Sequence, residues 1–448
     1  MKFYRMQVTP VRAIVFMYFI TALVSTILVY LPVFHRQGVQ LSFIDALFTA
    51  VSALSVTGLT VVNTADTFNG YGYALIMTIF QLGGIGLMTL GTFIYLVIGR
   101  NIGLGARRLM MIDQNRQQLS GLVRILRFVL TFSLVIEFIG TILLTLRLYF
   151  TGFTDSLKEA FYYGSFHAVA AFTNAGFDTF GNSLRSFEDD YVIQLIIIVL
   201  ILIGAIGFPV LIEVWEFIKH RKEHFRFSLF TKITVTTFVV LFIIGVLGIW
   251  LMENERFFAD KSWHEKLTYS VFNSITARNG GLSTMDVADF GAPTQFLIST
   301  LMVIGASPSS MGGGIRTTTF AIVILAIIAY AKGNSEVRAF KRRISQEDVM
   351  KSFVVFSTAI LIVVAGIICV DTFESQRHSL NAVIFEVSSA FGTTGLSMGI
   401  TGDLDPESKS ILILLMFMGR IGLLSLLLFF QRDKKTKIRY PEERVIIG

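Results

Sequence analysis

The amino-acid sequence predicts an all-α membrane protein of four repeated helix–loop–helix units, with eight spanning helices and four re-entrant helices around one pseudo-fourfold axis. Three observations predict this fold: the apolar composition, the spacing of long apolar segments, and a short motif that recurs four times. Of the 448 residues, 53% are hydrophobic and 15% are charged, whereas a soluble protein carries roughly 25% charged residues. This apolar excess is too large for an ordinary core, so lipid must be the solvent for much of the chain.

Long apolar segments recur at lengths that suit a spanning helix, which needs about 20 apolar residues. The first of them, Ala13 to Phe34, is uncharged, which favours a spanning helix over a short cleavable signal peptide. Spanning helices are expected at 13–34, 71–99, 126–150, 191–219, 229–252, 295–330, 352–372 and 408–430. Within each pair lies an amphipathic segment too short to cross the hydrocarbon layer twice, which indicates a re-entrant half-helix. These segments are 41–58, 156–176, 263–281 and 379–395.

Basic residues predict the topology, because they are enriched in cytoplasmic flanks. They cluster at 100–127, 219–232 and 332–351 and again in the tail after Gln431. With eight spans and both termini in the cytoplasm, all four clusters fall on one side. Acidic residues concentrate on the other side, where they would attract cations. The net charge of +7 is therefore a topology signal, and nucleic-acid binding is not expected. The single cysteine, Cys369, lies in an apolar run and allows no disulfide within the chain.

The four re-entrant segments share a sequence pattern. The last part of each begins with phenylalanine and ends in glycine followed by leucine or phenylalanine, as in Phe48-TAVSALSVTG-Leu59. The four glycines are Gly58, Gly176, Gly281 and Gly395. A second glycine motif follows each of them after 25, 28, 24 and 24 residues, at Gly83-GIG, Gly204-AIG, Gly305-ASP and Gly419-RIG. Four matched pairs at nearly constant spacing indicate fourfold internal repetition. The expected units are residues 1–100, 101–222, 223–340 and 341–432, followed by a basic cytoplasmic tail at 433–448.

Four backbone segments around one axis favour a cation pore. A dehydrated K⁺ needs about eight oxygen ligands, which rings of backbone carbonyls supply. Glycine allows a positive φ that turns carbonyls toward the axis. The side chains beside the glycines vary between the copies, which indicates that the backbone contacts the ion. The residues expected to form this K⁺ selectivity filter are Val56, Thr57, Gly58, Asn174, Ala175, Gly176, Asn279, Gly280, Gly281, Thr393, Thr394 and Gly395.

These helix–pore loop–helix repeats, each with one filter glycine, resemble the superfamily of K⁺ transporters that includes the KtrB, TrkH, plant HKT and KdpA proteins. The resemblance covers essentially the whole chain. Eight spans without an extra N-terminal helix pair are most similar to the KtrB group of the bacterial Ktr systems. Gly58 favours K⁺, because some HKT proteins that prefer Na⁺ carry serine at the first filter position.

Two features of the later repeats resemble the family's gate. The second helix of the third repeat is interrupted at 305–319, where Pro308 and three glycines weaken a helix. Arg420 lies mid-helix in a spanning segment, where a charge is costly and function is the default. The resemblance implies a movable intramembrane loop below the filter, with Ser307, Ser309, Gly312, Gly313, Gly314 and Arg420 as gate residues.

Three further charged residues lie within the apolar segments. Arg278 and Glu386 are expected to form an ion pair that braces the filter, and Glu137 is interpreted as structural. His167 and Tyr269 on the re-entrant helices are expected to serve packing.

The resemblance also implies the setting in which the protein works. It implies a multi-pass location in the bacterial plasma membrane, a homodimer of pore subunits, and a KtrA-like cytosolic ring that binds ATP or ADP and, in some species, c-di-AMP. No nucleotide-binding motif is visible in this chain, and no cofactor is expected. K⁺ is the expected cargo, with Na⁺ as a candidate activator.

Three other functional classes are compatible with an apolar chain of this kind. A Na⁺-selective or poorly selective channel of the same architecture is the main alternative. A secondary transporter would usually show twofold rather than fourfold repetition. A membrane enzyme would need clustered histidines or carboxylates at membrane depth, and the sequence shows none.

Overall fold

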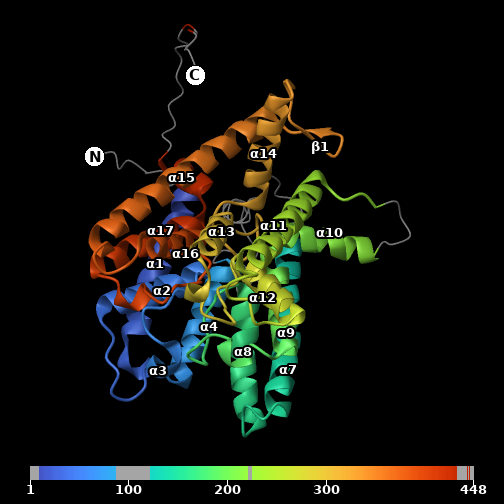
Figure 1. The fold of residues 1–448 in the computed structure, drawn as a ribbon. Helices are drawn as coiled ribbons and strands as arrows, with labels where there is room; N and C mark the ends of the chain where they lie inside the picture. Colours follow the sequence, from blue (N-terminus) through green and yellow to red (C-terminus); the bar gives the residue numbers. More distant parts are fainter. Residues whose placement is uncertain (1–9, 87–121, 220–224, 431–440, 442, 444–448) are drawn as a thin grey trace.

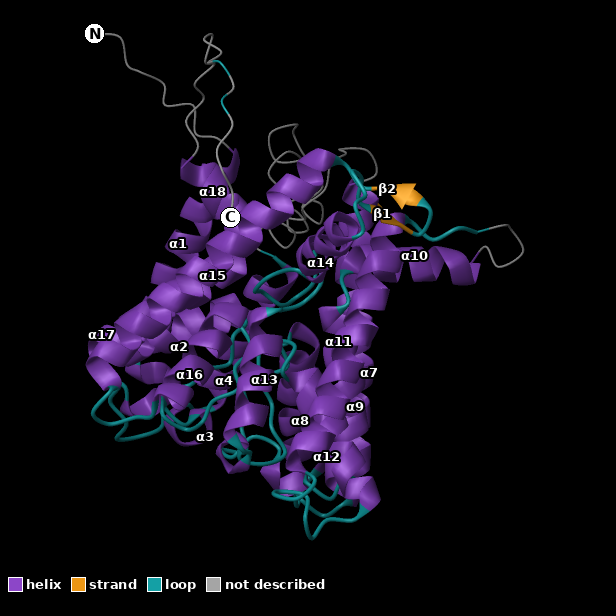
Figure 2. Ribbon diagram, turned by 45° about the horizontal axis from the view of Figure 1, so that its top comes forward, coloured by secondary structure: helices purple, strands orange, loops and turns teal. Residues whose placement is uncertain are grey.

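The computed structural model describes residues 10–86, 122–219, 225–430, 441 and 443. Between its loops, the regular secondary structure of this part is helical apart from one small hairpin and an isolated bridge between His35 and Phe68 (Figures 1 and 2). The first repeat contains α1 (Pro10–Tyr30), α2 (Phe43–Ser55), α3 (Thr64–Thr67) and α4 (Gly70–Ile85). The second contains α7 (Leu122–Phe150), α8 (Leu157–Thr173), α9 (Tyr191–Ala205) and α10 (Phe208–Lys219). The third contains α11 (Leu229–Glu253), α12 (Trp263–Thr276), α13 (Ala292–Val303) and α14 (Thr317–Ala331). The fourth contains α15 (Gln346–Glu374), α16 (Leu380–Gly392), α17 (Pro406–Ile421) and α18 (Leu423–Phe430). Strands β1 (Arg338–Ala339) and β2 (Arg342–Arg343) pair antiparallel between α14 and α15.

The first helix of each repeat is a long outer helix. By length and composition, α1, α7, α11 and α15 can each cross a membrane without interruption. Their outward faces carry large exposed apolar side chains such as Phe16, Phe138 and Leu361, which suit contact with lipid. Each outer helix packs along its own re-entrant helix, in the pairs α1 with α2, α7 with α8, α11 with α12, and α15 with α16. The all-α membrane architecture expected from the sequence is thereby confirmed.

The second helices differ from the sequence prediction. They were expected to be continuous in three repeats, but α9 and α10 meet at a 102° bend and α17 and α18 at a 95° bend. The breaks fall at Gly207 (φ +95°) and Gly422 (φ +86°), and α4 ends in the same way at Gly86 (φ +97°). A positive φ ends the helical path, and glycine adopts it without a steric penalty. The expected extension of the second span to residue 99 lies outside the described residues.

The second glycine motif has a packing role. A Cβ atom on Gly83 would clash with the carbonyl of Leu54, one on Gly204 with that of Phe172, and one on Gly419 with that of Phe391. Each carbonyl belongs to the residue four positions before the filter glycine of the same repeat. Only glycine permits this close approach of backbone to backbone. The second helix of each of these repeats therefore supports the last turn of its re-entrant helix.

The two ends of the described spans lie on one side of the molecule. Arg12, near the start of α1, donates a hydrogen bond from Nε to the carbonyl of Phe429 in α18 at 3.3 Å. In Figure 2, α18, the beginning of α15 and the β1–β2 hairpin lie at the upper end, and the loops around α3 lie at the opposite end. This arrangement agrees with an even number of crossings.

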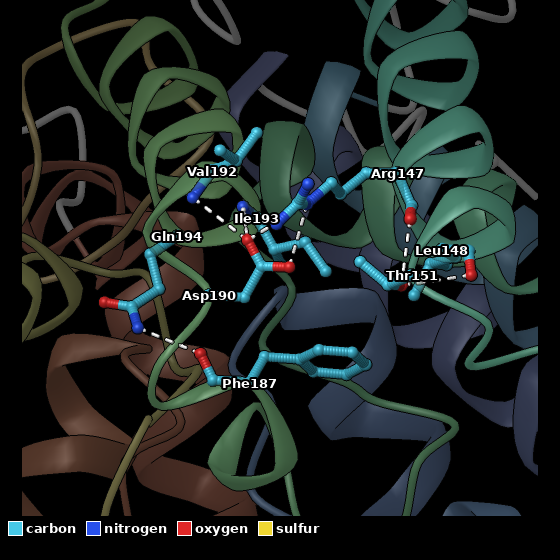
Figure 3. A network of polar contacts seen from close by, with 8 residues as sticks. All are labelled: Arg147, Leu148, Thr151, Phe187, Asp190, Val192, Ile193 and Gln194. Carbon is cyan, nitrogen blue, oxygen red and sulfur yellow. Dashed lines mark hydrogen bonds and ion pairs between the residues drawn. The ribbon is translucent and has the colours of Figure 1, made fainter.

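Outer and second helices are tied together at the other side of the molecule. In the second repeat, Arg147 at the end of α7 forms an ion pair with Asp190, 2.9 Å from Nε to Oδ2, and Asp190 accepts hydrogen bonds from the first amides of α9 (Figure 3). In the third repeat, Glu253 accepts from the amide of Gly291 at 2.9 Å, and in the fourth, Glu374 accepts from the amide of Asp405 at 2.8 Å. The carboxylate in each case satisfies the N-terminus of the second helix.

Removing the Asp190 carboxylate is expected to destabilise the second repeat. Asp190→Ala should lower the free energy of unfolding by about 1–2 kcal/mol, because two helix amides lose their acceptor. Asp190→Asn should cost less, since asparagine is also a good N-cap and the partly exposed ion pair contributes at most about 1 kcal/mol. Denaturant titration of the purified protein in detergent measures both. Equal losses for the two variants would contradict the capping role.

Candidate functional site

The four segments that follow the re-entrant helices meet at one axis. A Cβ atom built on Gly58 would lie 2.7 Å from the Cα of Gly176, and one on Gly176 would lie 3.0 Å from the Cα of Gly281. From Gly281 the corresponding distance to the Cα of Gly395 is 3.4 Å, and from Gly395 back to Gly58 it is 3.1 Å. The chain of contacts closes on itself, so the four glycines form a ring, which we call the glycine ring. Residues more than 300 positions apart in the sequence lie side by side in it.

One backbone conformation recurs at the ring. The residues two positions before each glycine, Val56, Asn174, Asn279 and Thr393, have φ between +52° and +73°, and the glycines have φ between +69° and +93°. In the first repeat, the amide of Val56 donates to Ala53 and the amide of Thr57 donates to Ser52. This is a Schellman ending, and the second and fourth repeats have the same two hydrogen bonds.

The third repeat reaches this conformation with one residue fewer. There the amide of Gly280 donates to the carbonyl four residues earlier, at Thr276, instead of five. The shorter distance from Phe272 to Gly281 in the sequence is therefore absorbed in the last turn of α12. The first and fourth repeats carry backbone strain at the ring. Val56 and Thr393 are β-branched and have positive φ, and the left-handed region costs about 1–2 kcal/mol for a residue with a Cβ atom.

The ring is suited to a dehydrated cation. Val56, Thr57, Asn174, Ala175, Asn279, Thr393 and Thr394 are all fully buried. None of the twelve residues predicted for the filter is charged, and the carbonyls of Thr57, Ala175 and Thr394 lie close to the Cβ positions of neighbouring ring glycines. The carboxyl ends of α2, α8, α12 and α16 converge there, and each contributes roughly half a negative charge through the helix dipole. The site therefore stabilises positive charge without a carboxylate.

Hydroxyl groups on the re-entrant helices hold the segments in place. Ser52 Oγ donates to the carbonyl of Leu59 at 2.7 Å and accepts from the amide of Gly58 at 3.2 Å. Ser389 Oγ accepts from the amide of Gly395 at 3.0 Å, and Thr276 Oγ1 donates to the carbonyl of Leu282 at 2.6 Å. The second repeat has Ala170 at the matching position, so its segment lacks this brace. The four copies are alike in backbone and unequal in their supporting side chains.

Asn279 joins the third and fourth segments. Its side-chain nitrogen donates to the carbonyl of Gly392, and to the carbonyl and hydroxyl of Thr393 at 2.9 and 3.2 Å. The loop between α13 and α14, residues 304–316, lies directly beside this contact. The amide of Gly313 in that loop donates to Thr393 Oγ1 at 2.8 Å. The filter segment of the fourth repeat and the interrupted helix of the third are thus directly bonded.

The 304–316 loop fills the space between the second helices. The amides of Ser307 and Met311 donate to the carbonyls of Ala205 and Gly204 at 3.1 Å, at the end of α9. The carbonyl of Ser309 accepts from the amide of Phe208, which begins α10, at 3.0 Å. Within the predicted gate set, Ser307, Gly312 and Gly313 are buried, and Ser309 and Gly314 have positive φ. The loop is therefore held largely by backbone hydrogen bonds to a neighbouring repeat.

Arg420 connects this loop to the first repeat. Its guanidinium donates to the carbonyl of Met311 in the loop, and to the carbonyls of Gly83 and Gly84 at the end of α4, the last at 3.0 Å. Arg420 is 9% exposed, and its described acceptors are all backbone carbonyls. Charged donors form the stronger hydrogen bonds, so Arg420 is a clamp between three repeats.

Sequence reasoning missed a second arginine of the loop. Arg316 donates to the carbonyls of Gly312 and, at 3.4 Å, Ser307. Together with Arg420 it lines a cavity of about 770 Å³ that extends from the loop to Asp348 and Lys351 at the start of α15. Arg316 lies inside the apolar segment 295–330, and a charged residue in such a segment is a functional candidate by default. The two arginines therefore place positive charge on the wall of this cavity.

The expected ion pair between Arg278 and Glu386 is wrong. Arg278 lies over the ring of Phe238 at 4.0 Å and donates to the carbonyls of Phe238 and Gly305. Glu386 accepts instead from Ser397, Thr401 and the amide of Met398. The two side chains serve different loops, because Arg278 turns back toward α11 and Glu386 caps the turn that follows the fourth filter segment. His167 stacks on Phe180 at 4.0 Å, as expected of a packing residue.

A substitution at Thr393 can remove the hydrogen bond between the 304–316 loop and the segment after α16. Thr393→Val keeps the shape of the side chain and removes the hydroxyl that accepts from the amide of Gly313 and from the side chain of Asn279. For the gate expected from the sequence, this change predicts a three- to tenfold rise in basal cation flux, because a hydrogen bond of this kind contributes about 0.5–1.5 kcal/mol to the contact between the loop and Thr393. Flux into proteoliposomes measures it, and Thr393→Ser is the matched control that retains the hydroxyl. An unchanged flux in Thr393→Val would show that this contact does not hold the loop.

Comparison with known proteins places the chain in a family. Residues 11–438 match the family described as TrkH, cation transport protein. The chain is 49% identical over 441 residues to the Ktr system potassium uptake protein D of Bacillus subtilis, with 98% of this chain and 97% of the relative covered. It is 35% identical to the Ktr system potassium uptake protein B of the same organism, with 98% and 97% covered. The chain therefore belongs to the TrkH family of cation transport proteins, and it is a multi-pass membrane transporter.

A solved structure shows the same fold. The potassium transporter TrkH from Vibrio parahaemolyticus superposes with a TM-score of 0.73 at 18% sequence identity, covering 96% of this chain and 87% of the other. The family match and the Bacillus subtilis relatives confirm the resemblance inferred from the four glycine motifs, and the solved structure confirms the fold.

Proposed function

We propose that the chain carries K⁺ into a bacterial cell through a pore whose selectivity filter is the glycine ring. The observation that carries the proposal is the closure of Gly58, Gly176, Gly281 and Gly395 into one buried ring with a repeated backbone conformation. Membership of a cation transport family and the potassium uptake named for both Bacillus subtilis relatives support the same cargo.

Backbone carbonyls of the twelve filter residues replace the hydration shell of the ion. No chemical step is needed to drive uptake. An inside-negative potential favours inward movement of one monovalent cation by about 2.3 kcal/mol per 100 mV. The acidic loops on the side of α3 form the outer mouth, and both termini lie in the cytoplasm.

The 304–316 loop and Arg420 form the gate. In the arrangement described here, the loop lies beside the filter, bonded to Thr393, and Arg316 and Arg420 present positive charge to a cation leaving the ring. Opening requires the loop to leave the carbonyls of α9 and the Arg420 clamp to release. The gate is closed in this arrangement and opens by a shift of the loop.

The control of this gate comes from outside the chain. The relatives are named as parts of a Ktr system, which supports a multi-component assembly. A KtrA-like cytosolic ring that binds ATP or ADP, acting on a homodimer of this subunit, is the proposed partner, with Na⁺ as a candidate activator. Its docking surface is the basic cytoplasmic side, which includes the β1–β2 hairpin with Arg338, Lys341, Arg342 and Arg343.

Growth of a bacterium that lacks its own K⁺-uptake systems tests the proposal. The chain is expressed with and without a KtrA-like partner on medium of low K⁺ and on medium of high K⁺. Rescue on low K⁺ with the partner is the expected result. Failure to rescue, with the protein present in the membrane fraction, would contradict K⁺ uptake.

A further inference from the structure

A carboxyl group lies in the middle of α7 without a charged partner. Glu137 is 4% exposed and stands at the centre of a helix long enough to cross the membrane. Among the described residues, its side-chain partner is Gln81 on α4, whose Nε2 donates to Glu137 Oε2 at 2.6 Å. Among the residues that the structure describes, Glu137 forms no ion pair. The transport path proposed above does not use this group.

Two buried oxygen atoms at this contact have no hydrogen-bond partner in the part of the chain that the structure describes. They are Glu137 Oε1 and Gln81 Oε1, one on each side of the same hydrogen bond. If Glu137 were ionised, both atoms would be unsatisfied acceptors in a low-dielectric interior, and the carboxylate would lack a counter-charge. Each unsatisfied buried group costs about 1–3 kcal/mol, and an uncompensated buried charge costs more.

A single proton removes all three penalties. A carboxylic acid has one O–H donor, whereas a carboxylate has none. With the proton on Oε1, Glu137 can donate to Gln81 Oε1 while Gln81 Nε2 donates to Glu137 Oε2. The two side chains then form a closed pair of hydrogen bonds between a carboxylic acid and an amide.

We propose that Glu137 holds a proton and, as a neutral acid, forms a doubly hydrogen-bonded pair with Gln81 that fixes the end of α4. Gln81 lies two and three residues before Gly83 and Gly84, whose carbonyls accept from Arg420. The pair ties that turn to α7 of the second repeat. Glu137 is therefore a positioning residue for the gate, which it reaches through Gln81, the α4 turn and Arg420.

The proton is tested directly by infrared spectroscopy. The difference spectrum between the wild-type protein and Glu137→Gln in liposomes should contain the carbonyl stretch of a protonated carboxylic acid at neutral pH, shifted by exchange into D₂O. This readout does not depend on transport, so it stands even if the chain fails to carry K⁺. A difference spectrum with carboxylate bands only would overturn the proposal.

The positioning role is tested by flux through the pore, and this part rests on the proposed function. Glu137→Gln should retain the wild-type basal K⁺ flux, because two amides also form a pair of hydrogen bonds. Glu137→Leu and Gln81→Leu should each raise basal flux at least threefold by loosening the Arg420 clamp. The exchanged pair Gln81→Glu with Glu137→Gln should restore the wild-type value. A Glu137→Gln variant that behaves like Glu137→Leu would overturn the neutral pair, because only an ionised group would then explain the loss.

Discussion

Gly58→Ser is expected to reduce the preference for K⁺ over Na⁺ at least tenfold. The new Cβ atom would lie 2.7 Å from the Cα of Gly176 and closer still to the carbonyl oxygen of Ala175. Neither neighbour can move away, because both are backbone atoms of the ring. The ring must widen or tilt, and its carbonyls then no longer match one dehydrated ion. Competitive uptake of K⁺ and Na⁺ into proteoliposomes measures the change.

Gly38 provides a matched control for this substitution. Gly38 has φ +86°, nearly the same as the +88° of Gly58, but a Cβ atom on Gly38 would meet nothing within 4 Å. Gly38→Ser therefore introduces the same backbone strain without the clash. Its selectivity should equal that of the wild type. Equal selectivity in Gly58→Ser and the wild type would refute the assignment of Gly58 to the filter.

Arg420→Ala is expected to raise partner-independent K⁺ flux at least tenfold. The substitution removes a positive charge beside the path and leaves the carbonyls of Met311, Gly83 and Gly84 without their donor. Hydrogen bonds from a charged group contribute about 1.5–3 kcal/mol each, and 1.4 kcal/mol already changes a closed-to-open ratio tenfold. Single-channel or flux measurements on the pore subunit alone give the result.

Arg420→Lys separates charge from geometry. Lysine keeps the positive charge but cannot donate to the loop and to α4 from one planar group. Its flux should lie between those of the wild type and Arg420→Ala. A decrease of flux in Arg420→Ala would mean that the arginine supports the open pore, and the clamp would have to be abandoned.

The sequence predicted the symmetric features of the fold well. Hydrophobic length located the four outer helices, and the recurrence of Phe and Gly located the four re-entrant segments. These features depend on local composition and on spacing, which can be determined from the sequence alone. The positive φ at Gly58 and its counterparts was also expected, because few other residues adopt it easily.

The breaks in the second helices were not predicted, although the glycines at which they occur are visible in the sequence. The motifs at Gly83, Gly204 and Gly419 each end in a further glycine, and Gly86, Gly207 and Gly422 are the residues that turn the chain. In one sequence the motif indicates repetition, and the same glycines also fit a continuous apolar helix. Glycine is tolerated within membrane helices, so the apolar run alone could not show that these residues adopt positive φ.

The partners of the charged residues could not be predicted from the sequence. Arg278 and Glu386 were paired because both lie near the filter and have opposite charge, yet each is satisfied by nearer backbone or hydroxyl groups. Arg420 was placed near the gate loop through the family resemblance, but its acceptors in α4 depend on how the first and fourth repeats meet. Contacts between repeats are set by tertiary packing and are not encoded in spacing.

The location of a bound ion tests the central claim most directly. Thallium or rubidium can replace K⁺ in crystals of the protein, and their anomalous scattering identifies the site without assumption about side chains. The proposed pore predicts peaks on the axis of the glycine ring, between the carbonyls of Thr57, Ala175, Gly280 and Thr394. Peaks confined to other places, with none on this axis, would contradict the assignment of the ring as the K⁺ filter.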